Sequence, residues 1–337
     1  MTPLAEAAAL AVGATGVIWV GSTLLESASE NLSDYYGLPA VVQGAVVVAI
    51  GSSFPELATV VISTVRHGAF DLGVGAIVGS AIFNVLVIPA VSGLACDGEM
   101  ESSRAVVYKE AQFYMLSVSV LVITFALGVI YNPVEAEGIS GEVTRPLAAV
   151  PVALYGLYVF IQYQDVSDHG ATPETDVNPY RNWALLAVSL VLIVVAVEGI
   201  VEAALAFGDA FGTPSSLWGL TVVAAATSLP DAFVSVRAAR DGSGAVSLGN
   251  VLGSNVFDLL VAVPVGVLIA GSTVVNFAAA VPMMGFLTLA TVVLFTVLRT
   301  DLELSDPEAA TLVVVYALFV AWMVAETLGY LALVPGQ

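Results

Sequence analysis

The chain has 337 residues, of which 58% are hydrophobic and 11% charged, and its 28 acidic against 8 basic side chains give a formal charge of −20. A mean hydropathy of +0.96 excludes intrinsic disorder, the single cysteine excludes a disulfide scaffold, and the negative charge excludes a nucleic-acid-binding protein. A polytopic membrane protein remains, and its acidic, nearly lysine-free composition is typical of proteins from halophiles, where salt screens the repulsion between charges.

Ten apolar runs follow one another along the chain, each long enough for a membrane helix. A spanning helix needs about 20 predominantly apolar residues. The predicted spans are 4–25, 38–65, 71–95, 109–131, 146–163, 183–207, 216–239, 245–271, 275–298 and 308–334. Because they leave no room for a large soluble domain, we expect an all-α polytopic membrane protein.

The polar stretch between the fifth and sixth spans divides the chain. We predict a first five-helix repeat over 1–165, a polar linker over 166–182 and a second five-helix repeat over 183–337. Basic residues favour the cytoplasmic side of a membrane, and ten spans place six of the eight on the side away from the termini. Those six are Arg104, Lys109, Arg181, Arg237, Arg240 and Arg299. We therefore expect a multi-pass protein of the cell membrane with both termini outside.

Two sequence motifs occur once in each half. The stretch at 51–56 corresponds to 226–231, and the stretch at 78–84 corresponds to 252–258. The offset between the copies is 175 residues in the first pair (56 to 231) and 174 in the second (84 to 258). Five spans, an odd number, separate the copies, so the two halves enter the membrane in opposite directions. Inverted repeats of this kind are typical of secondary transporters with a binding site at the midplane.

The motifs place three carboxylates, Glu56, Asp231 and Asp258, in the middle of apolar spans. Each costs about 2.5–3.5 kcal/mol there, so a functional role is the first hypothesis. Hydroxyl and amide side chains accompany them at helical spacing: Ser52, Ser53, Ser80, Asn84, Thr227, Ser228 and Ser254. Pro55 and Pro230 each remove a backbone donor and free a carbonyl one turn earlier.

This set of possible ligands contains oxygen atoms only. Oxygen ligands suit hard cations, above all calcium with 6–8 ligands at about 2.3–2.6 Å, and sodium shares the preference. Zinc or copper would require histidine or cysteine, and neither residue occurs in the motifs. The motifs therefore predict a site for calcium and sodium ions.

At these motifs the chain resembles the sodium/calcium exchanger family, within the wider cation/calcium antiporters. Ser-Ser-Phe-Pro-Glu at 52–56 and Gly-Ser-Ala-Ile-Phe-Asn at 79–84 resemble the first repeat signature of that family. Thr-Ser-Leu-Pro-Asp at 227–231 and Gly-Ser-Asn-Val-Phe-Asp at 253–258 resemble the second. Together with the acidic composition, the resemblance indicates a prokaryotic member from a saline habitat.

The resemblance implies ten helices, four of which form a central cation site, while the first helix of each repeat slides to alternate access. It implies that Glu56 and Asp231 are shared between calcium and sodium, and that Asn84 and Asp258 complete the ring. The hydroxyl residues would supply further oxygens: Ser52, Ser53, Ser80, Thr227, Ser228 and Ser254. One departure is Asp231, where many prokaryotic relatives have Glu. The shorter side chain must come closer to the ion or bind it through water.

We therefore expect an antiporter in which sodium entry drives calcium extrusion, with calcium and sodium as transported ions and no cofactor. We expect no enzymatic activity, and as partners only these ions and the lipid bilayer, with no nucleic acid and no obligate protein partner. A proton/calcium exchanger and a potassium-dependent sodium/calcium exchanger remain alternatives. Proton/calcium exchangers resemble one another in having His directly after the motif acid. In this chain Leu57 follows Glu56 and Ala232 follows Asp231. A remote alternative is an intramembrane aspartyl protease with Asp231 and Asp258 as its dyad.

Overall fold

The computed structural model describes residues 3–36, 49–96, 98–135, 139–166, 177–327 and 330–331. Within these residues, nine helices are long and apolar enough to cross a membrane, and they match nine of the ten predicted spans. The second predicted span, 38–65, is described only from residue 49 onward. Its described part consists of α3 (Ala49–Ser52) and the apolar helix α4 (Phe54–Val65).

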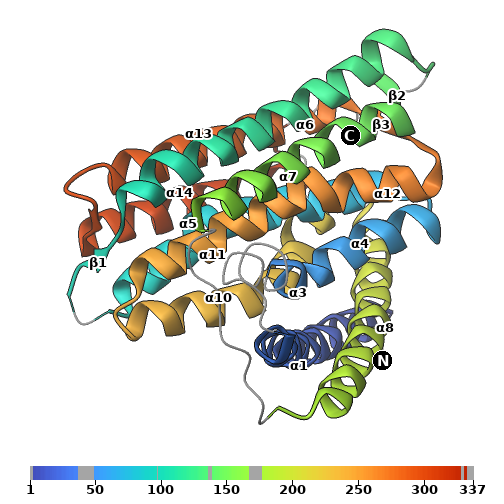
Figure 1. The fold of residues 1–337 in the computed structure, drawn as a ribbon. Helices are drawn as coiled ribbons and strands as arrows, with labels where there is room; N and C mark the ends of the chain where they lie inside the picture. Colours follow the sequence, from blue (N-terminus) through green and yellow to red (C-terminus); the bar gives the residue numbers. More distant parts are fainter. Residues whose placement is uncertain are drawn as a thin grey trace.

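The two halves contain the same succession of helices (Figure 1). The remaining helices of the first half are α1 (Pro3–Tyr36), α5 (Phe70–Leu94), the π-helical η2 (Ala105–Glu110) continuing into α6 (Ala111–Tyr131), and α7 (Arg145–Val166). The helices of the second half are α8 (Pro179–Phe211), α9 (Ser215–Trp218), the π-helical η3 (Gly219–Val223), α10 (Ala224–Arg240), α11 (Gly244–Phe257), the π-helical η4 (Asp258–Ala262), α12 (Val263–Ala270), α13 (Phe277–Leu298) and α14 (Asp306–Thr327).

Some predicted span ends are wrong. Helix α1 continues eleven residues beyond the predicted end at 25, because hydropathy marks only its apolar part whereas glutamates extend a helix readily. Helix α8 starts within the predicted linker, where the Asn178 side chain accepts a hydrogen bond from the Arg181 amide and Pro179 occupies the first turn. Helix α14 ends at Thr327, short of the predicted 334.

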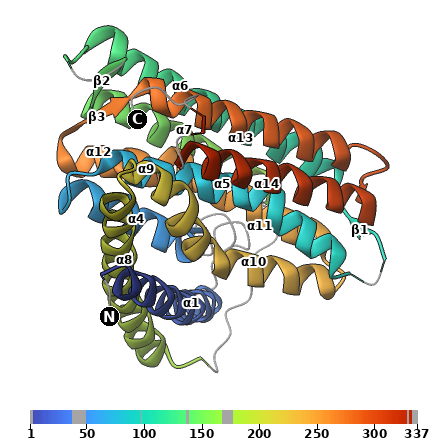
Figure 2. The same ribbon diagram turned by 180° about the vertical axis from the view of Figure 1, so that it is seen from behind.

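Two short sheets relate the halves by an approximate two-fold axis. Strand β1 (Met100–Glu101) pairs with β4 (Glu303–Leu304), and β2 (Ser140–Thr144) pairs with β3 (Ser272–Asn276), both antiparallel. β1 and β3 follow the third helix of their halves, whereas β2 and β4 precede the fifth. Exchanging the halves therefore converts one sheet into the other. The sheets lie at opposite ends of the bundle (Figures 1 and 2), which confirms the predicted inverted repeat.

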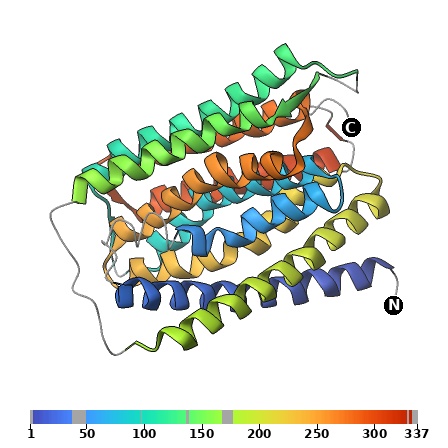
Figure 3. The same ribbon diagram turned by 45° about the vertical axis from the view of Figure 1, so that its right-hand side comes forward.

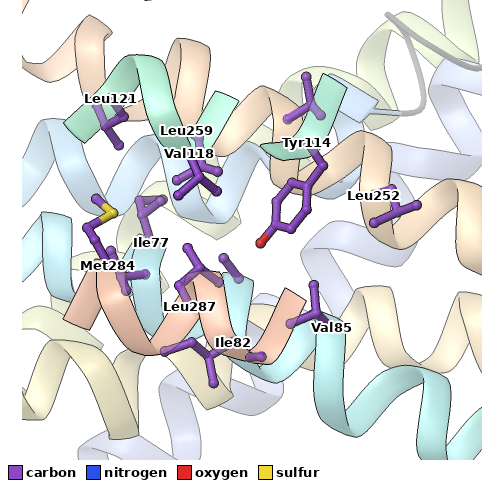
Figure 4. Packing of buried hydrophobic residues seen from close by; sticks show 14 of the residues in the cluster. Ile77, Ile82, Val85, Tyr114, Val118, Leu121, Leu252, Leu259, Met284 and Leu287 are labelled. Carbon is purple, nitrogen blue, oxygen red and sulfur yellow. The ribbon is translucent and has the colours of Figure 1, made fainter. Parts of the chain in front are cut away.

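The helices form three layers (Figure 3). α6, α7, α13 and α14 lie on one side, α1 and α8 cross each other on the opposite side, and α4, α5, α10, α11 and α12 lie between them. Apolar side chains from α5, α6, α11, η4 and α13 interlock in the main core (Figure 4). Burial of this surface stabilises the central layer, which contains both copies of the motifs.

Glycines of α5 allow it to approach the seventh span closely. A side-chain carbon at Gly79 would collide with the Leu220 carbonyl, and one at Gly75 would crowd the Ser216 carbonyl. Gly156 on α7, by contrast, is exposed and has no atom of the described residues within 4 Å of such a carbon. The close approach in the first repeat brings Ser80, the next residue, to the facing helix.

This difference predicts that Gly79→Ala destabilises the protein and that Gly156→Ala does not. Overpacking costs about 1–3 kcal/mol, whereas alanine is about 1 kcal/mol better than glycine in a helix. Thermal unfolding of both purified variants in detergent measures the effect. Equal midpoints for the two variants would contradict the role assigned to the contact.

Candidate cation site

All ten predicted site residues lie in the central layer, on α3–α4 and α5 of the first half and on α10, α11 and η4 of the second. None is more than 4% exposed. The four segments thus bring Ser52, Ser53, Glu56, Ser80, Asn84, Thr227, Ser228, Asp231, Ser254 and Asp258 into the buried interior.

The proline-containing segments differ between the halves. In the first, the helix is interrupted at Ser53 and restarts as α4, with Pro55 in the first turn and the Leu57 amide donating to the Ser53 carbonyl at 3.1 Å. Glu56 therefore lies at a helix N-terminus, which favours negative charge. In the second, α10 continues through Pro230, and the irregular backbone is η3, about two to three turns earlier. Both prolines were expected to disturb the helix by removing a backbone donor, but the helix is broken beside Pro55 only.

Direct hydrogen bonds join the two halves. The hydroxyls of Ser80 and Ser228 lie 2.7 Å apart, and Ser80 also donates to Glu56 Oε1 at 3.4 Å. If Ser80 donates to Glu56, Ser228 must be the donor of the shorter bond. The carboxylate of Glu56 is therefore connected through one hydroxyl to the opposite repeat.

Most carboxylate oxygens at the centre lack a donor. Glu56 Oε2 and both oxygens of Asp231 and Asp258 are buried and accept no hydrogen bond from the described residues. The three carboxylates interact electrostatically with one another. The polar side chains that approach them are Thr227 at Glu56, Ser52, Asn84 and Ser254 at Asp231, and Ser53 at Asp258. Among the described residues, no basic side chain forms an ion pair with these three carboxylates. An unpaired buried charge costs several kcal/mol, so a bound cation would stabilise this centre.

Carboxylates alone do not form a ready metal site here. In the described parts of the chain, no three His, Cys, Asp or Glu side chains gather closely enough to hold one ion. A cation would therefore need hydroxyl, amide or carbonyl oxygens as well, which are the groups that surround the acids. Such mixed oxygen sets suit hard cations rather than zinc or copper.

Asn255 is a site residue that the sequence interpretation missed. Its Nδ2 donates to the Ala81 carbonyl at 3.3 Å and to the Tyr114 hydroxyl at 3.4 Å, and its Oδ1 accepts from Asn84 Nδ2 at 2.9 Å. A backbone carbonyl can only accept, so the Asn255 nitrogen must face Ala81 and its oxygen must face Asn84. Asn84 then presents its nitrogen to Asn255, and its own Oδ1 is buried and has no partner among the described residues.

Asn255 thus orients the side-chain oxygen of Asn84, a predicted ligand, without being a predicted ligand itself. The signal in the sequence was its place inside the second motif, beside Ser254. The repeat comparison concealed it, because the corresponding residue of the first half is Ala81. Asn255 has no polar counterpart in the first repeat, yet it holds Asn84, a residue of the repeated motif, in place.

Replacing Asn255 by Ala leaves the Asn84 amide free to rotate and without its hydrogen-bond acceptor, and it removes the additional bond to the Ala81 carbonyl of α5. Lost partners of this kind cost about 1–3 kcal/mol. We expect the variant to lose most of the thermal stabilisation that added calcium gives the wild type. Asn250→Ala is the matched control, since Asn250 lies earlier on α11 and, among the described residues, donates to the Ser235 hydroxyl. An undiminished calcium shift in the Asn255 variant would rule out the orienting role.

Curated relatives resemble most of the chain. An uncharacterized membrane protein of Methanocaldococcus jannaschii is 29% identical over 257 residues, which cover 74% of this chain and 78% of that protein. The sodium/calcium exchanger MaX1 of Methanosarcina acetivorans is 26% identical over 271 residues, which cover 71% of this chain and 76% of that protein.

Two solved structures share the fold. The sodium-calcium exchanger NCX_Mj matches with a TM-score of 0.62 at 21% identity, over 95% of this chain and 99% of its own. The H⁺/Ca²⁺ exchanger CAX matches with a TM-score of 0.71 at 16% identity, over 96% of this chain and 87% of its own. The profile of the family described as sodium/calcium exchanger protein matches residues 6–164 and 181–325. The chain therefore belongs to the sodium/calcium exchanger family.

Proposed function

We propose that the protein is a secondary antiporter that exchanges sodium for calcium at the central oxygen cluster. The observation that supports this proposal is the set of buried carboxylate oxygens without donors on Glu56, Asp231 and Asp258. The proposed ligands are these acids with Asn84 and the six hydroxyl residues Ser52, Ser53, Ser80, Thr227, Ser228 and Ser254. Calcium and sodium are the transported ions.

The charge at the centre favours exchange. Three ionised carboxylates carry up to three negative charges, so one calcium ion leaves negative charge uncompensated. Several sodium ions in adjacent places neutralise the same groups. The two loads then compete for the same oxygens, and binding of one displaces the other. This competition couples calcium movement to sodium movement.

The arrangement of α1 and α8 supports alternating access. These first helices of the two repeats pack along each other outside the central layer, where α1 contacts α10 and α8 contacts α4. Sliding of the pair across the central layer would open the site to one side of the membrane at a time. We place the protein in the cell membrane with both termini outside, because six of its eight basic residues would then be cytoplasmic.

The choice of coupling ion rests on the sequence. A solved proton/calcium exchanger shares this fold, so the fold does not separate sodium from proton coupling. Proton-coupled relatives resemble one another in having His directly after the motif acid. In this chain those positions are Leu57 and Ala232. Potassium dependence remains the second candidate, because Phe257-Asp258 resembles the potassium-dependent type. The aspartyl-protease alternative is set aside, since the family consists of exchangers.

Tracer calcium uptake into sodium-loaded proteoliposomes tests the proposal. We expect uptake that requires an outward sodium gradient, persists without potassium and does not follow an imposed pH gradient. Glu56→Gln should abolish it, whereas the exposed Glu202→Gln should leave it unchanged. Uptake that is independent of sodium, or that is driven by a proton gradient alone, would disprove sodium coupling.

A further inference from the structure

The last turns of α1 carry acids on one face. Glu26, Glu30 and Asp34 follow at four-residue spacing, which aligns side chains along a helix. Glu26 is half-buried and Glu30 is exposed. Neighbouring members interact electrostatically, Glu26 with Glu30 and Glu30 with Asp34. We call these three residues the α1 acidic ladder.

The inner end of the ladder adjoins the candidate cation site. A side-chain carbon at Gly51 would lie 3.8 Å from the Glu26 Cα, so α1 packs directly on the turn that precedes Ser52. Ser52 in turn approaches the Asp231 carboxylate. Two turns before Glu26, Trp19 stacks on Phe233 with ring centroids 4.7 Å apart, which holds α1 against α10.

Glu26 also interacts electrostatically with Asp231, whose two oxygens are buried and accept no hydrogen bond from the described residues. One turn before Glu26, the Ser22 hydroxyl is buried and likewise has no partner among them. Unpaired oxygens therefore continue from the site onto the face of α1. Two neighbouring carboxylates that are both ionised repel each other, and a cation between them offsets this repulsion.

The ladder is confined to one end of the molecule. The positions 175 residues later are Val201, Leu205 and Asp209, so α8 has no three-acid counterpart at these positions. Of the two acids that α8 carries at four-residue spacing, Glu198 pairs with Arg66 and His67, and Glu202 is exposed. In Figure 3 the end of α1 that carries the ladder lies away from the N-terminus. A route that depends on these acids would therefore serve one membrane face and not the other.

We propose that Glu26, Glu30 and Asp34 form a one-sided access route along which hard cations, calcium or sodium, reach Asp231. This inference rests on the proposed exchange function. Carboxylates along an access path raise the local cation concentration and the rate of capture. Glu26 acts as the last relay before the site, and Glu30 and Asp34 act as the outer steps.

Calcium transport by Glu26→Gln, measured separately from each membrane face, tests the route. Right-side-out and inside-out vesicles supply the two faces. We expect about a tenfold rise in the apparent KM for calcium at one face, within the range of electrostatic capture effects, and an unchanged KM at the other. Because Glu30 is exposed, Glu30→Gln should fold normally and show a smaller rise at the same face. Glu202→Gln, which removes an exposed acid from α8, is the matched control.

The outcomes separate the access route from its alternatives. Equal KM changes at both faces would place Glu26 in the central site and overturn the one-sided route. Unchanged KM values at both faces, for Glu26→Gln and Glu30→Gln alike, would overturn it as well. Wild-type transport without sodium dependence would refute the proposed function but leave the facial asymmetry measurable. Molar salt should shrink the effect, since the Debye length falls to about 3 Å.

Discussion

Unpaired negative charge at the centre of the helix bundle is the constraint on which the rest of the structure depends. Glu56, Asp231 and Asp258 are almost completely buried, and most of their oxygens accept nothing from the described residues. In a bilayer such groups are costly, so the surrounding helices must supply an environment in which cations can replace water. In the proposed site, the serines, Thr227 and Asn84 would meet this need, because their oxygens can complete a coordination shell.

The inverted repeat places these oxygens on both sides of one axis, but the two halves are not equivalent. In the first half the helix is broken at Ser53, just before Pro55, whereas in the second half α10 continues through Pro230. Asn84 on a regular helix corresponds to Asp258 at the start of a π-helical segment. Such irregular turns are frequent at functional sites. In the proposed site, the two repeats would therefore offer each ion different sets of neighbours.

Much of the fold was predictable because hydropathy and self-similarity report it directly. Nine predicted spans correspond to observed helices, and the odd number of spans between the motif copies implied the inversion. The ends of α1 and α14 were not predictable from hydropathy. Hydropathy decreases at the first charged residues of α1 although the helix continues, and it stays high along the sequence after Thr327, where α14 ends. Asn255 was overlooked because the comparison of the repeats selected polar residues that occur in both halves, and its counterpart Ala81 has no polar side chain.

By itself the sequence determined which oxygen-bearing residues enter the membrane and in what order, because spacing, repeat offset and apolar length are properties of the chain alone. Only the tertiary structure decided which of them meet. Ser80 reaches Ser228 because Gly79 lets α5 approach the facing span, and Asn84 keeps a free oxygen because Asn255 takes its nitrogen. Glu26 gained its place beside Asp231 because α1 packs on the Gly51 turn. These contacts depend on helix packing across the repeats, which no local pattern encodes.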